Sequence, residues 1–243
     1  MSHLGQMTDV GSDPKSRGER HPFKDQVSAA LAHELRDPLN SILTTLNCVR
    51  DRRVDEGTTR QALARAERQA LHMSRIVENV LALCRADQGK LSLRTELVDV
   101  PAVIADSVGV VDPFFTTRRH RLTVSLPAEP VNLIADPSRL TQVVTNLLVN
   151  AAKYTEPGGE IDLAAYAASD TFVLRVRDNG RGIARDLLPH IFDMFQQGEG
   201  MCGGLGIGLA LVKVLVESHG GSIAAFSAGP GAGSEFVVRL PRS

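Results

Sequence analysis

The first residues in this chain that could do chemistry are His33 and Glu34, an imidazole beside a carboxylate. Apolar residues recur around them at helical spacing, and this periodicity predicts an amphipathic helix. His33 lies two residues from each of Leu31 and Leu35, so at about 100° per residue it points away from the apolar stripe. Pro38 follows and is expected to bend the helix. An exposed histidine beside an acid can act as a nucleophile with its own base, or it can be an ordinary surface histidine.

A second group of polar residues lies in a predicted helix that begins at Pro137 and ends near Tyr154. Asn146, Asn150 and Lys153 are spaced by four and three residues, so they share one face of that helix. A carboxamide oxygen can bind Mg²⁺, and a lysine can bind phosphate. The face is therefore either a metal and phosphate site or a solvated polar surface, and the helix alone does not decide between them.

Glycines mark two further positions. Asp178 directly follows a predicted strand and precedes Gly180 and Gly182, which allow a tight turn. A carboxylate fixed at a strand end can accept a hydrogen bond from an exocyclic amine, although Asp-Asn-Gly is also common in plain turns. Residues 203–208 open a predicted helix, where backbone N–H groups and the helix dipole favour an anion. No strand directly precedes these glycines, which argues against a dinucleotide-binding fold.

The first half of the chain predicts a helical hairpin that positions His33. A helix is expected over about 22–52, followed by a polar loop over 51–57. Thr58 or Thr59 is expected to cap a second helix, and Gly89 suits its C-terminal cap. The heptad seam of this second helix consists of Leu63, Ala66, Ala70, Met73, Val77, Val80 and Cys84.

Two such helices leave an apolar seam uncovered, and a second hairpin covers it in a four-helix bundle. We therefore expect a homodimer through residues 22–88. The alternative is a hairpin that packs only against the second half of its own chain.

The second half of the chain predicts strands and helices in mixed order, which is typical of an α/β sandwich with helices on one face of a sheet. Phe192 and Phe195, three residues apart, are expected to share a face of a short helix that packs in the core. The expected helices cover 101–111, 137–154 and 206–219, and the expected strands cover 91–98, 121–126, 131–134, 161–166, 172–177, 222–227 and 234–240.

The composition excludes several classes of protein. A net charge of -1 and the absence of Trp argue against nucleic-acid binding. The three cysteines are scattered and odd in number, so they suggest neither a disulfide framework nor a zinc site, and we expect a cytoplasmic protein. No run of about 20 apolar residues predicts a membrane span. Residues 1–21 lack the apolar centre of a signal peptide and are expected to form a flexible lead-in.

Taken together and in this order, the motifs resemble those of the sensor histidine kinases of two-component signalling. The resemblance covers about residues 22–240. It implies a dimerisation and phosphotransfer domain over 22–88 and an ATP-binding domain over 89–243, of the Bergerat type shared with gyrase and the Hsp90 chaperones. The matching segments are 33–39 (phosphoacceptor box), 146–154 (asparagine box), 178–182 (first glycine box), 192–195 (phenylalanine box) and 204–208 (second glycine box).

The resemblance implies a chemical role for each group. His33 would be phosphorylated from ATP with Glu34 as its base, and the phosphoryl group would pass to an aspartate in the receiver domain of a response regulator. Asn150 would bind Mg²⁺, and Asp178 would contact the adenine amine. Residues from about 196 to 203 would form a lid over ATP. The remaining residues implied to line the ATP site are Asn146, Lys153, Tyr154, Gly180, Gly182, Ile183, Phe195, Gly204, Leu205, Gly206, Gly208 and Leu209.

One position departs from the family pattern. Asp37 stands where this family usually has Thr or Asn, which places a water for dephosphorylating the partner. The resemblance therefore does not imply that this chain dephosphorylates its partner.

Two rival functions are also considered. A conformational ATPase of the same superfamily would share Asn150 and Asp178, but it would not need a histidine beside a glutamate on a dimer helix. A non-catalytic scaffold would be expected to lack His33, Asn150 or Asp178, and all three are present.

Overall fold

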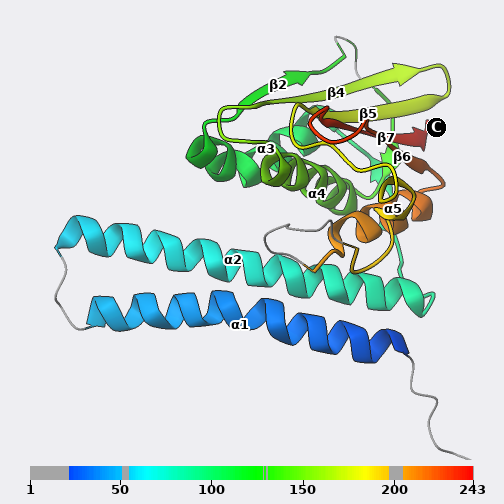
Figure 1. Cartoon of the computed structure of the whole chain (residues 1–243). Helices are drawn as coiled ribbons and strands as arrows, with labels where there is room; N and C mark the ends of the chain where they lie inside the picture. Colours follow the sequence, from blue (N-terminus) through cyan, green and yellow to red (C-terminus); the bar gives the residue numbers. More distant parts are fainter. Residues whose placement is uncertain (1–21, 51–54, 128, 130, 197–204, 243) are drawn as a thin grey trace, which may run out of the picture.

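The computed structural model describes residues 22–50, 55–127, 129, 131–196 and 205–242. Helices α1 (Pro22–Arg50) and α2 (Glu56–Asp87) lie side by side as an antiparallel pair (Figure 1). The prediction that Thr58 or Thr59 caps α2 is wrong, because the cap is Asp55. Its carboxylate accepts hydrogen bonds from the backbone N–H of Thr58 at 3.0 Å and from the Thr58 hydroxyl at 2.6 Å. Gly89 has a φ of 64° and directly follows the C-cap residue of α2, as expected of a terminating glycine.

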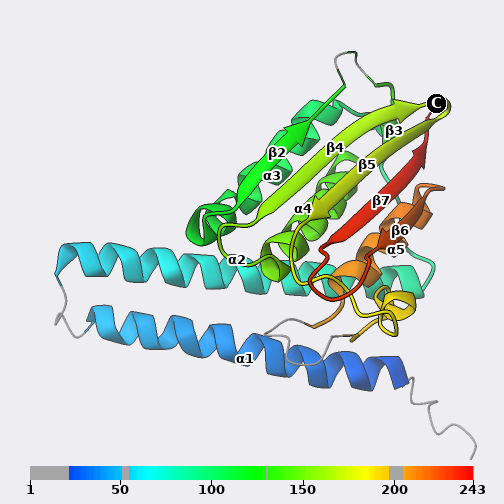
Figure 2. The same cartoon turned by 45° about the horizontal axis from the view of Figure 1, so that its top comes forward.

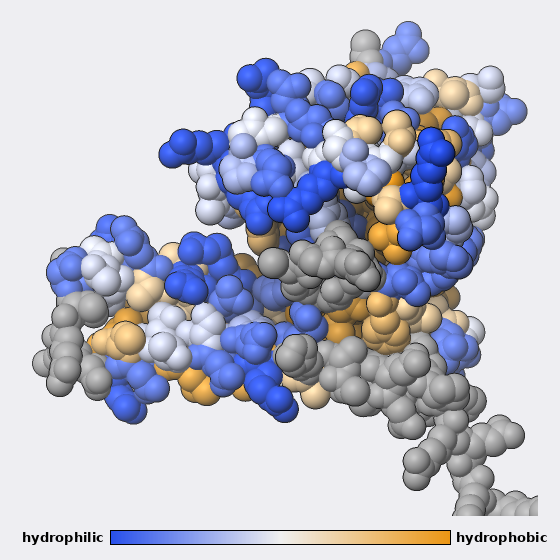
Figure 3. Space-filling view, in the orientation of Figure 1, coloured by the Kyte–Doolittle hydropathy of each residue, from blue (hydrophilic) through white to orange (hydrophobic). Residues whose placement is uncertain are grey.

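The apolar residues of the hairpin point in two directions. Ile76, Val80 and Leu83 of α2 are buried against the second half of the chain. The predicted seam of α2 is therefore split, because Val80 is buried while Leu63 and Val77 are exposed. Apolar side chains also remain at the surface of both helices (Figure 3), namely Leu39, Leu43 and Leu46 on α1 and Leu63, Leu71, Val77 and Leu81 on α2.

The second half of the chain is an α/β sandwich, as the sequence predicts. The five-stranded sheet has the order β2-β4-β5-β7-β6, in which β2 is parallel to β4 and all other neighbours are antiparallel. Helices α3, α4 and α5 cover one face of the sheet, and α2 lies beyond them (Figures 1 and 2). The strands are β2 (Arg121–Ser125), β4 (Glu160–Ala168), β5 (Thr171–Asp178), β6 (Ser222–Phe226) and β7 (Ser234–Pro241), and the helices are α3 (Val100–Arg118), α4 (Pro137–Tyr154) and α5 (Gly208–Ser218).

Four predicted elements differ from the structure. The strand expected over 131–134 is wrong for residues 131–133, since the strand β3 covers only Ile134–Ala135. Of the strand expected over 91–98, only β1 (Glu96–Leu97) forms, paired with β3 (Ile134–Ala135), because the backbone N–H of Arg94 instead donates to the Asp136 carboxylate. The helix expected over 101–111 begins at Val100 and continues to Arg118 despite Pro113, and it ends where Arg119 adopts a φ of 57°. The short helix expected to carry Phe192 and Phe195 does not form, since Phe195 has a φ of 65° that no right-handed helix contains. The 3₁₀ turn η1 (Leu188–His190) ends before both residues.

Helix α3 bears on the expected absence of a membrane span. By length and composition alone, α3 is apolar enough to cross a membrane. In the structure it packs against α4 and buries Val103, Ile104 and Val111. The core helix of a soluble domain passes the same test of length and composition, so the expected absence of a span stays a prediction.

The entry of the chain into α4 is fixed by one buried carboxylate, Asp136. It caps α4 by accepting from the backbone N–H groups of Ser138 at 3.1 Å and Arg139 at 3.2 Å, and from the Ser138 hydroxyl at 2.7 Å. Its second oxygen accepts from the backbone N–H of Arg94 at 2.9 Å. One side chain therefore holds both the first turn of α4 and the segment that leaves the hairpin.

We expect Asp136→Ala to destabilise the protein by about 2 kcal/mol, the upper part of the range for a helix cap, because it also frees the Arg94 N–H. Burial acts to raise the pKa of Asp136, but the hydrogen bonds from Arg94, Ser138 and Arg139 outweigh it, so the pKa lies below its ordinary value of 3.8. The unfolded chain therefore takes up this proton first as the pH falls. The stabilisation is fully present well above pH 3.8 and is lost as the pH drops through the lower folded-state pKa.

Urea unfolding of the wild type and of Asp136→Ala at neutral and acidic pH tests this expectation. Asp99→Ala is the matched control, because Asp99 caps α3 through a single exposed hydrogen bond of 3.5 Å and should cost about 0.5 kcal/mol or less. A difference between wild type and Asp136→Ala that grows as the pH falls would contradict the argument.

Candidate active site

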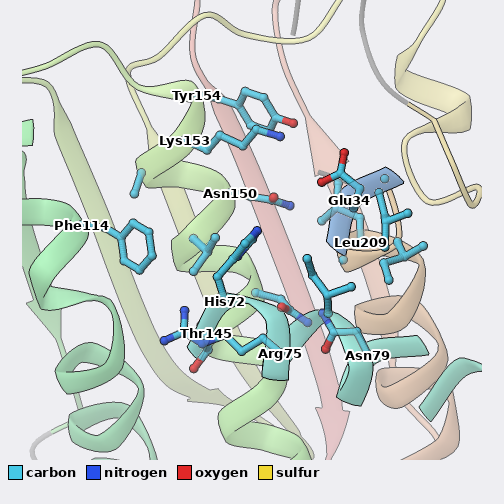
Figure 4. Close-up of a pocket in the computed structure, with 18 of the residues that line it drawn as sticks. Glu34, His72, Arg75, Asn79, Phe114, Thr145, Asn150, Lys153, Tyr154 and Leu209 are labelled. Carbon is cyan, nitrogen blue, oxygen red and sulfur yellow. The ribbon is translucent and has the colours of Figure 1, made fainter. Parts of the chain in front are cut away.

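A cavity of about 420 Å³ lies where the helical hairpin meets the α/β sandwich (Figure 4). Helices α4 and α5 form one wall, and α2 forms the wall that faces them. Glu34 of α1 also lines the cavity, between α2 and the start of α5. Residues from both halves of the chain, more than 100 positions apart in sequence, are therefore brought to one site.

The polar face of α4 is a wall of this cavity. Asn146, Asn150 and Lys153 all line it and are all half-buried, so the face is not simply a solvated surface. The opposite face of α4 packs in the core, with Leu147 and Leu148 fully buried. The Nδ2 group of Asn146 is buried and has no hydrogen-bond partner among the described residues. A buried donor beside a cavity is what an anionic or polar ligand would satisfy.

The amino-terminal end of α5 also opens into the cavity. Gly206, Gly208 and Leu209 line it, and no side chain caps the first turn of α5. The exposed N–H groups and the helix dipole therefore favour a negatively charged group there. Gly206 has a φ of 65°, and a Cβ atom at this position would lie 2.8 Å from the carbonyl oxygen of Gln196. Only glycine fits this close approach.

A hydrogen bond joins two residues that flank the predicted lid. The backbone N–H of Phe195 donates to the carbonyl oxygen of Gly206 at 3.1 Å. Gln196 and Leu205 line the cavity, whereas Phe195 does not. Residues 197–203 of the predicted lid, and Gly204 after them, lie outside the described residues.

Asp178 lines a second pocket, which shares no lining residue with the main cavity. It ends β5 and is buried, with 5% of its surface exposed. One carboxylate oxygen accepts from the Gly180 N–H at 2.9 Å, and the other accepts from the Ser234 hydroxyl at 2.5 Å. Asp178 and Ser234 line this pocket together, which gives it a fixed hydrogen-bond acceptor.

The turn after Asp178 packs directly on the end of α4. The Arg181 N–H donates to the carbonyl oxygen of Tyr154 at 3.0 Å, and a Cβ atom on Gly180 would lie 2.3 Å from that same oxygen. Gly182 has a φ of 68° and a Cβ there would meet the carbonyl oxygen of Gly229 at 2.1 Å. Gly180 and Gly182 therefore act by allowing this packing, and neither they nor Ile183 line the main cavity.

The predicted catalytic pair is only partly defined. His33 lies in α1, and nothing beyond its place in this helix is described. Glu34 is half-buried and its carboxylate lies on the same side of the cavity as Leu209 (Figure 4). The residue next to the predicted phosphoacceptor therefore faces the polar wall formed by α4.

Several residues at the site were not predicted from the sequence. His72, Arg75 and Asn79 of α2 line the main cavity, and Ser234 holds Asp178. The three α2 residues follow one another at spacings of three and four, which is a detectable face of a helix. The sequence gives no sign of which partner that face meets, so nothing singled these residues out.

Comparison with known families agrees with this arrangement. Residues 23–89 match the family described as "His Kinase A (phospho-acceptor) domain". Residues 135–243 match the family described as "Histidine kinase-, DNA gyrase B-, and HSP90-like ATPase". The two matches fall on the helical hairpin and on the part of the sandwich that carries α4, Asp178 and α5.

Individual relatives point the same way. The probable sensor histidine kinase TcrY of Mycobacterium tuberculosis is 36% identical over 220 residues, which is 89% of this chain and 45% of TcrY. The structure of the mycobacterial sensor histidine kinase MprB is 32% identical with a TM-score of 0.54, over 61% of this chain and 97% of that chain. A structure described as full-length ShkA in complex with AMPPNP is 26% identical with a TM-score of 0.65, over 90% of this chain and 46% of that chain.

The chain therefore belongs to the sensor histidine kinase family, with a helical phosphoacceptor region followed by an ATP-binding α/β domain. It spans 15% to 49% of the length of eight curated relatives. The relatives thus carry long segments that this chain does not match.

Proposed function

We propose that this chain is an ATP-dependent protein histidine kinase that phosphorylates His33 and passes the phosphoryl group to an aspartate on a response regulator. The observation that carries the proposal is the shared cavity, in which Glu34 of the phosphoacceptor helix faces Asn150 and Lys153 of the ATP-binding domain. A kinase needs its acceptor and its nucleotide at one site. Family membership supports the same activity.

ATP fits the chemistry of the two pockets. The main cavity presents Lys153, an unsatisfied amide donor of Asn146 and the start of α5, which are all suited to phosphates. The second pocket presents the fixed Asp178 acceptor, suited to the exocyclic amine of adenine. The AMPPNP complex of the related ShkA supports a nucleotide at this fold.

Mg²⁺ would depend on the nucleotide. Among the described residues, no group of three or more His, Cys, Asp or Glu side chains could hold a metal ion. Asn150 offers an amide oxygen on the cavity wall, and phosphate oxygens and waters would complete the octahedral shell that Mg²⁺ requires. We therefore assign Asn150 as the protein ligand of a Mg²⁺ ion that arrives with ATP.

The chain's own residues then have distinct tasks in the transfer. A neutral ring nitrogen of His33 forms a bond to the γ-phosphorus as the bond to the ADP oxygen breaks, and ADP leaves. Glu34 accepts the proton from the other ring nitrogen and orients the ring. Lys153 offsets the negative charge on the transferring group, and the Mg²⁺ ion supplies further positive charge when bound.

The assembly follows from the hairpin. The exposed leucines of α1 and α2 are the surface that a second hairpin would cover, which supports a homodimer through residues 22–88. Phosphoacceptor domains of this family are dimerisation modules, and their kinases pair with response regulators. We place the chain in the cytoplasm, where such partners and ATP are found.

Incubation with γ-labelled ATP and Mg²⁺ tests the proposal. We expect protein-bound label that is stable in base and lost in acid, as a phosphoramidate bond is, and no labelling when Mg²⁺ is chelated. Released phosphate without protein-bound label would favour the conformational ATPase. Bound nucleotide with neither label nor phosphate release would favour the non-catalytic scaffold.

A further inference from the structure

The wall of the cavity that faces α4 carries hydrogen-bond donors and comes from the helical hairpin. His72 and Arg75 of α2 both line the cavity, one helical turn apart on the same face. His72 points toward Asn150 and Lys153, across the space between α2 and α4 (Figure 4). The expected phosphate site is therefore enclosed by positively charged or donor groups from two sides.

Arg75 lies against an aromatic ring, and the Glu78 carboxylate, three residues further along α2, acts on its charge but does not line the cavity. The guanidinium carbon of Arg75 lies 5.8 Å from the centre of the Phe114 ring, and both residues line the cavity. In the described part of the chain, Arg75 makes no ion pair. A guanidinium over an aromatic face keeps the N–H groups at its edge available to an acceptor.

The charge around His72 also points to an anion. Burial lowers the pKa of His72, the positive charges of Arg75 and Lys153 lower it further, and the Glu34 carboxylate acts in the opposite direction. Among the described residues that line the cavity, Glu34 is the one acidic side chain, whereas Arg75, Arg118 and Lys153 are basic. Basic side chains thus outnumber acidic ones among the described lining residues, which favours an anionic ligand there.

A separate contact fixes α2 at this distance from α4. The side-chain amide of Gln142 on α4 donates to the amide oxygen of Asn79 at 2.9 Å. Ile76 and Val80, which alternate with the polar residues, are buried against the core. The face that carries His72 and Arg75 is thus set by packing and by a hydrogen bond, and not by the charged groups themselves.

We propose that His72 and Arg75 of α2 bind the phosphates of the nucleotide held between α2 and α4, so that the hairpin contributes directly to ATP affinity. This inference rests on the proposed nucleotide site. Arg75 would donate to phosphate oxygens from its guanidinium edge, and His72 would donate from a ring N–H. Bound nucleotide would then tie the hairpin to the α/β sandwich, because its phosphates would contact both.

The test compares nucleotides with and without phosphates on the full chain. Affinities for ATP and for adenosine are measured by calorimetry or competition for the wild type, His72→Ala, Arg75→Ala and the double variant. Loss of a hydrogen bond to a charged phosphate weakens binding, and partial exposure of the two side chains limits the loss. We therefore expect a loss of ATP affinity of about 5- to 20-fold for each single variant, with adenosine affinity unchanged within about twofold.

Two further variants keep the result interpretable. Arg65→Ala removes an exposed arginine of the same helix that does not line the cavity, and it should leave both affinities unchanged. Arg75→Lys keeps the charge but loses the fork of donors, so it should fall between wild type and Arg75→Ala. Thermal unfolding confirms that each variant is folded.

The outcomes are distinct. Equal ATP affinity in wild type and double variant would overturn this inference and leave the proposed function intact. Parallel losses for ATP and adenosine would also overturn it, because they would show a structural role for the two residues. Absence of ATP binding by the wild type would instead overturn the proposed function.

Discussion

A chain carrying His33→Gln is expected to bind ATP as tightly as the wild type and to take up no phosphoryl group. Glutamine is neutral and similar in reach, but its amide nitrogen is not a nucleophile, since its lone pair is delocalised into the carbonyl group. Affinity should be kept because the groups assigned to bind the nucleotide lie on elements other than α1. The measurement is protein-bound label from γ-labelled ATP, alongside nucleotide affinity by calorimetry.

The chain offers a matched control for this experiment. His190 is an exposed histidine whose Nδ1 atom lies 3.0 Å from the Asp193 carboxylate, so it also forms a histidine–acid pair. It does not line the cavity, and His190→Gln should label like the wild type. The comparison separates position at the nucleotide from the mere pairing of a histidine with an acid.

A second histidine makes mapping of the label necessary. His72 also lines the cavity. Label that persists in His33→Gln and maps to His72 would contradict the assignment of His33. Label that is lost in both His33→Gln and His190→Gln would show that the experiment reports on folding and not on the acceptor.

Local sequence patterns were sufficient to predict an element where its own sequence determines its structure. Helix α4 begins at Pro137 and ends at Tyr154, as predicted, because a proline opens it and a strong apolar face drives it into the core. The same pattern placed Asn146, Asn150 and Lys153 on one face, and that face does line the cavity. In a helix with a periodic sequence, the spacing alone determines the face on which each residue lies.

Prediction failed where a distant partner decides the local structure. Leu91 to Val98 alternates like a strand, but the Arg94 N–H bonds to Asp136, which lies 42 positions away in sequence. The split seam of α2 has the same origin, since Val80 turns to the sandwich while Val77 stays exposed. Helical spacing shows that two faces exist, and only the folded chain shows which surface each one meets.

The residues of the site divide in the same way into those that local patterns predicted and those that they missed. Residues that form a local motif were found, whereas His72 and Arg75 belong to the site only because the hairpin folds back over α4. Ser234 was missed because its role depends on the pairing of β7 with β5, which sets Ser234 opposite Asp178. The roles of such residues depend on contacts between two elements. The residue spacing within each element therefore does not reveal them.

The Asp178→Asn variant is expected to lose about 10- to 100-fold in ATP affinity and to discriminate less against GTP. In the wild type the two carboxylate oxygens are held by the Gly180 N–H and the Ser234 hydroxyl, and each keeps capacity to accept a second hydrogen bond. An adenine amine can supply that bond, whereas guanine has a carbonyl oxygen at the equivalent position and would face an acceptor. Asparagine has one acceptor oxygen in place of two and adds an N–H donor. It therefore weakens the contact with the adenine amine and relieves the repulsion of the guanine carbonyl oxygen.

The magnitude follows from the charge and the burial of this group. Asp178 is 5% exposed, and a hydrogen bond to a charged acceptor contributes about 1.5–3 kcal/mol, which is about 10- to 100-fold in affinity. Ser234→Ala should lose less, because it removes one support of the carboxylate and leaves the Gly180 N–H bond in place. The readout is the ratio of ATP to GTP affinity, which a general loss of fold would not change.

Asp162→Asn is the matched control, since Asp162 is an exposed carboxylate on the adjacent strand β4, paired with Arg177 in the sheet register. It carries the same change of charge and should leave both affinities unchanged. If Asp178→Asn kept the ATP-to-GTP ratio of the wild type, the base would not reach the Asp178 pocket. The nucleotide would then have to lie wholly within the cavity between α2 and α4, and the base would be recognised by groups other than this carboxylate.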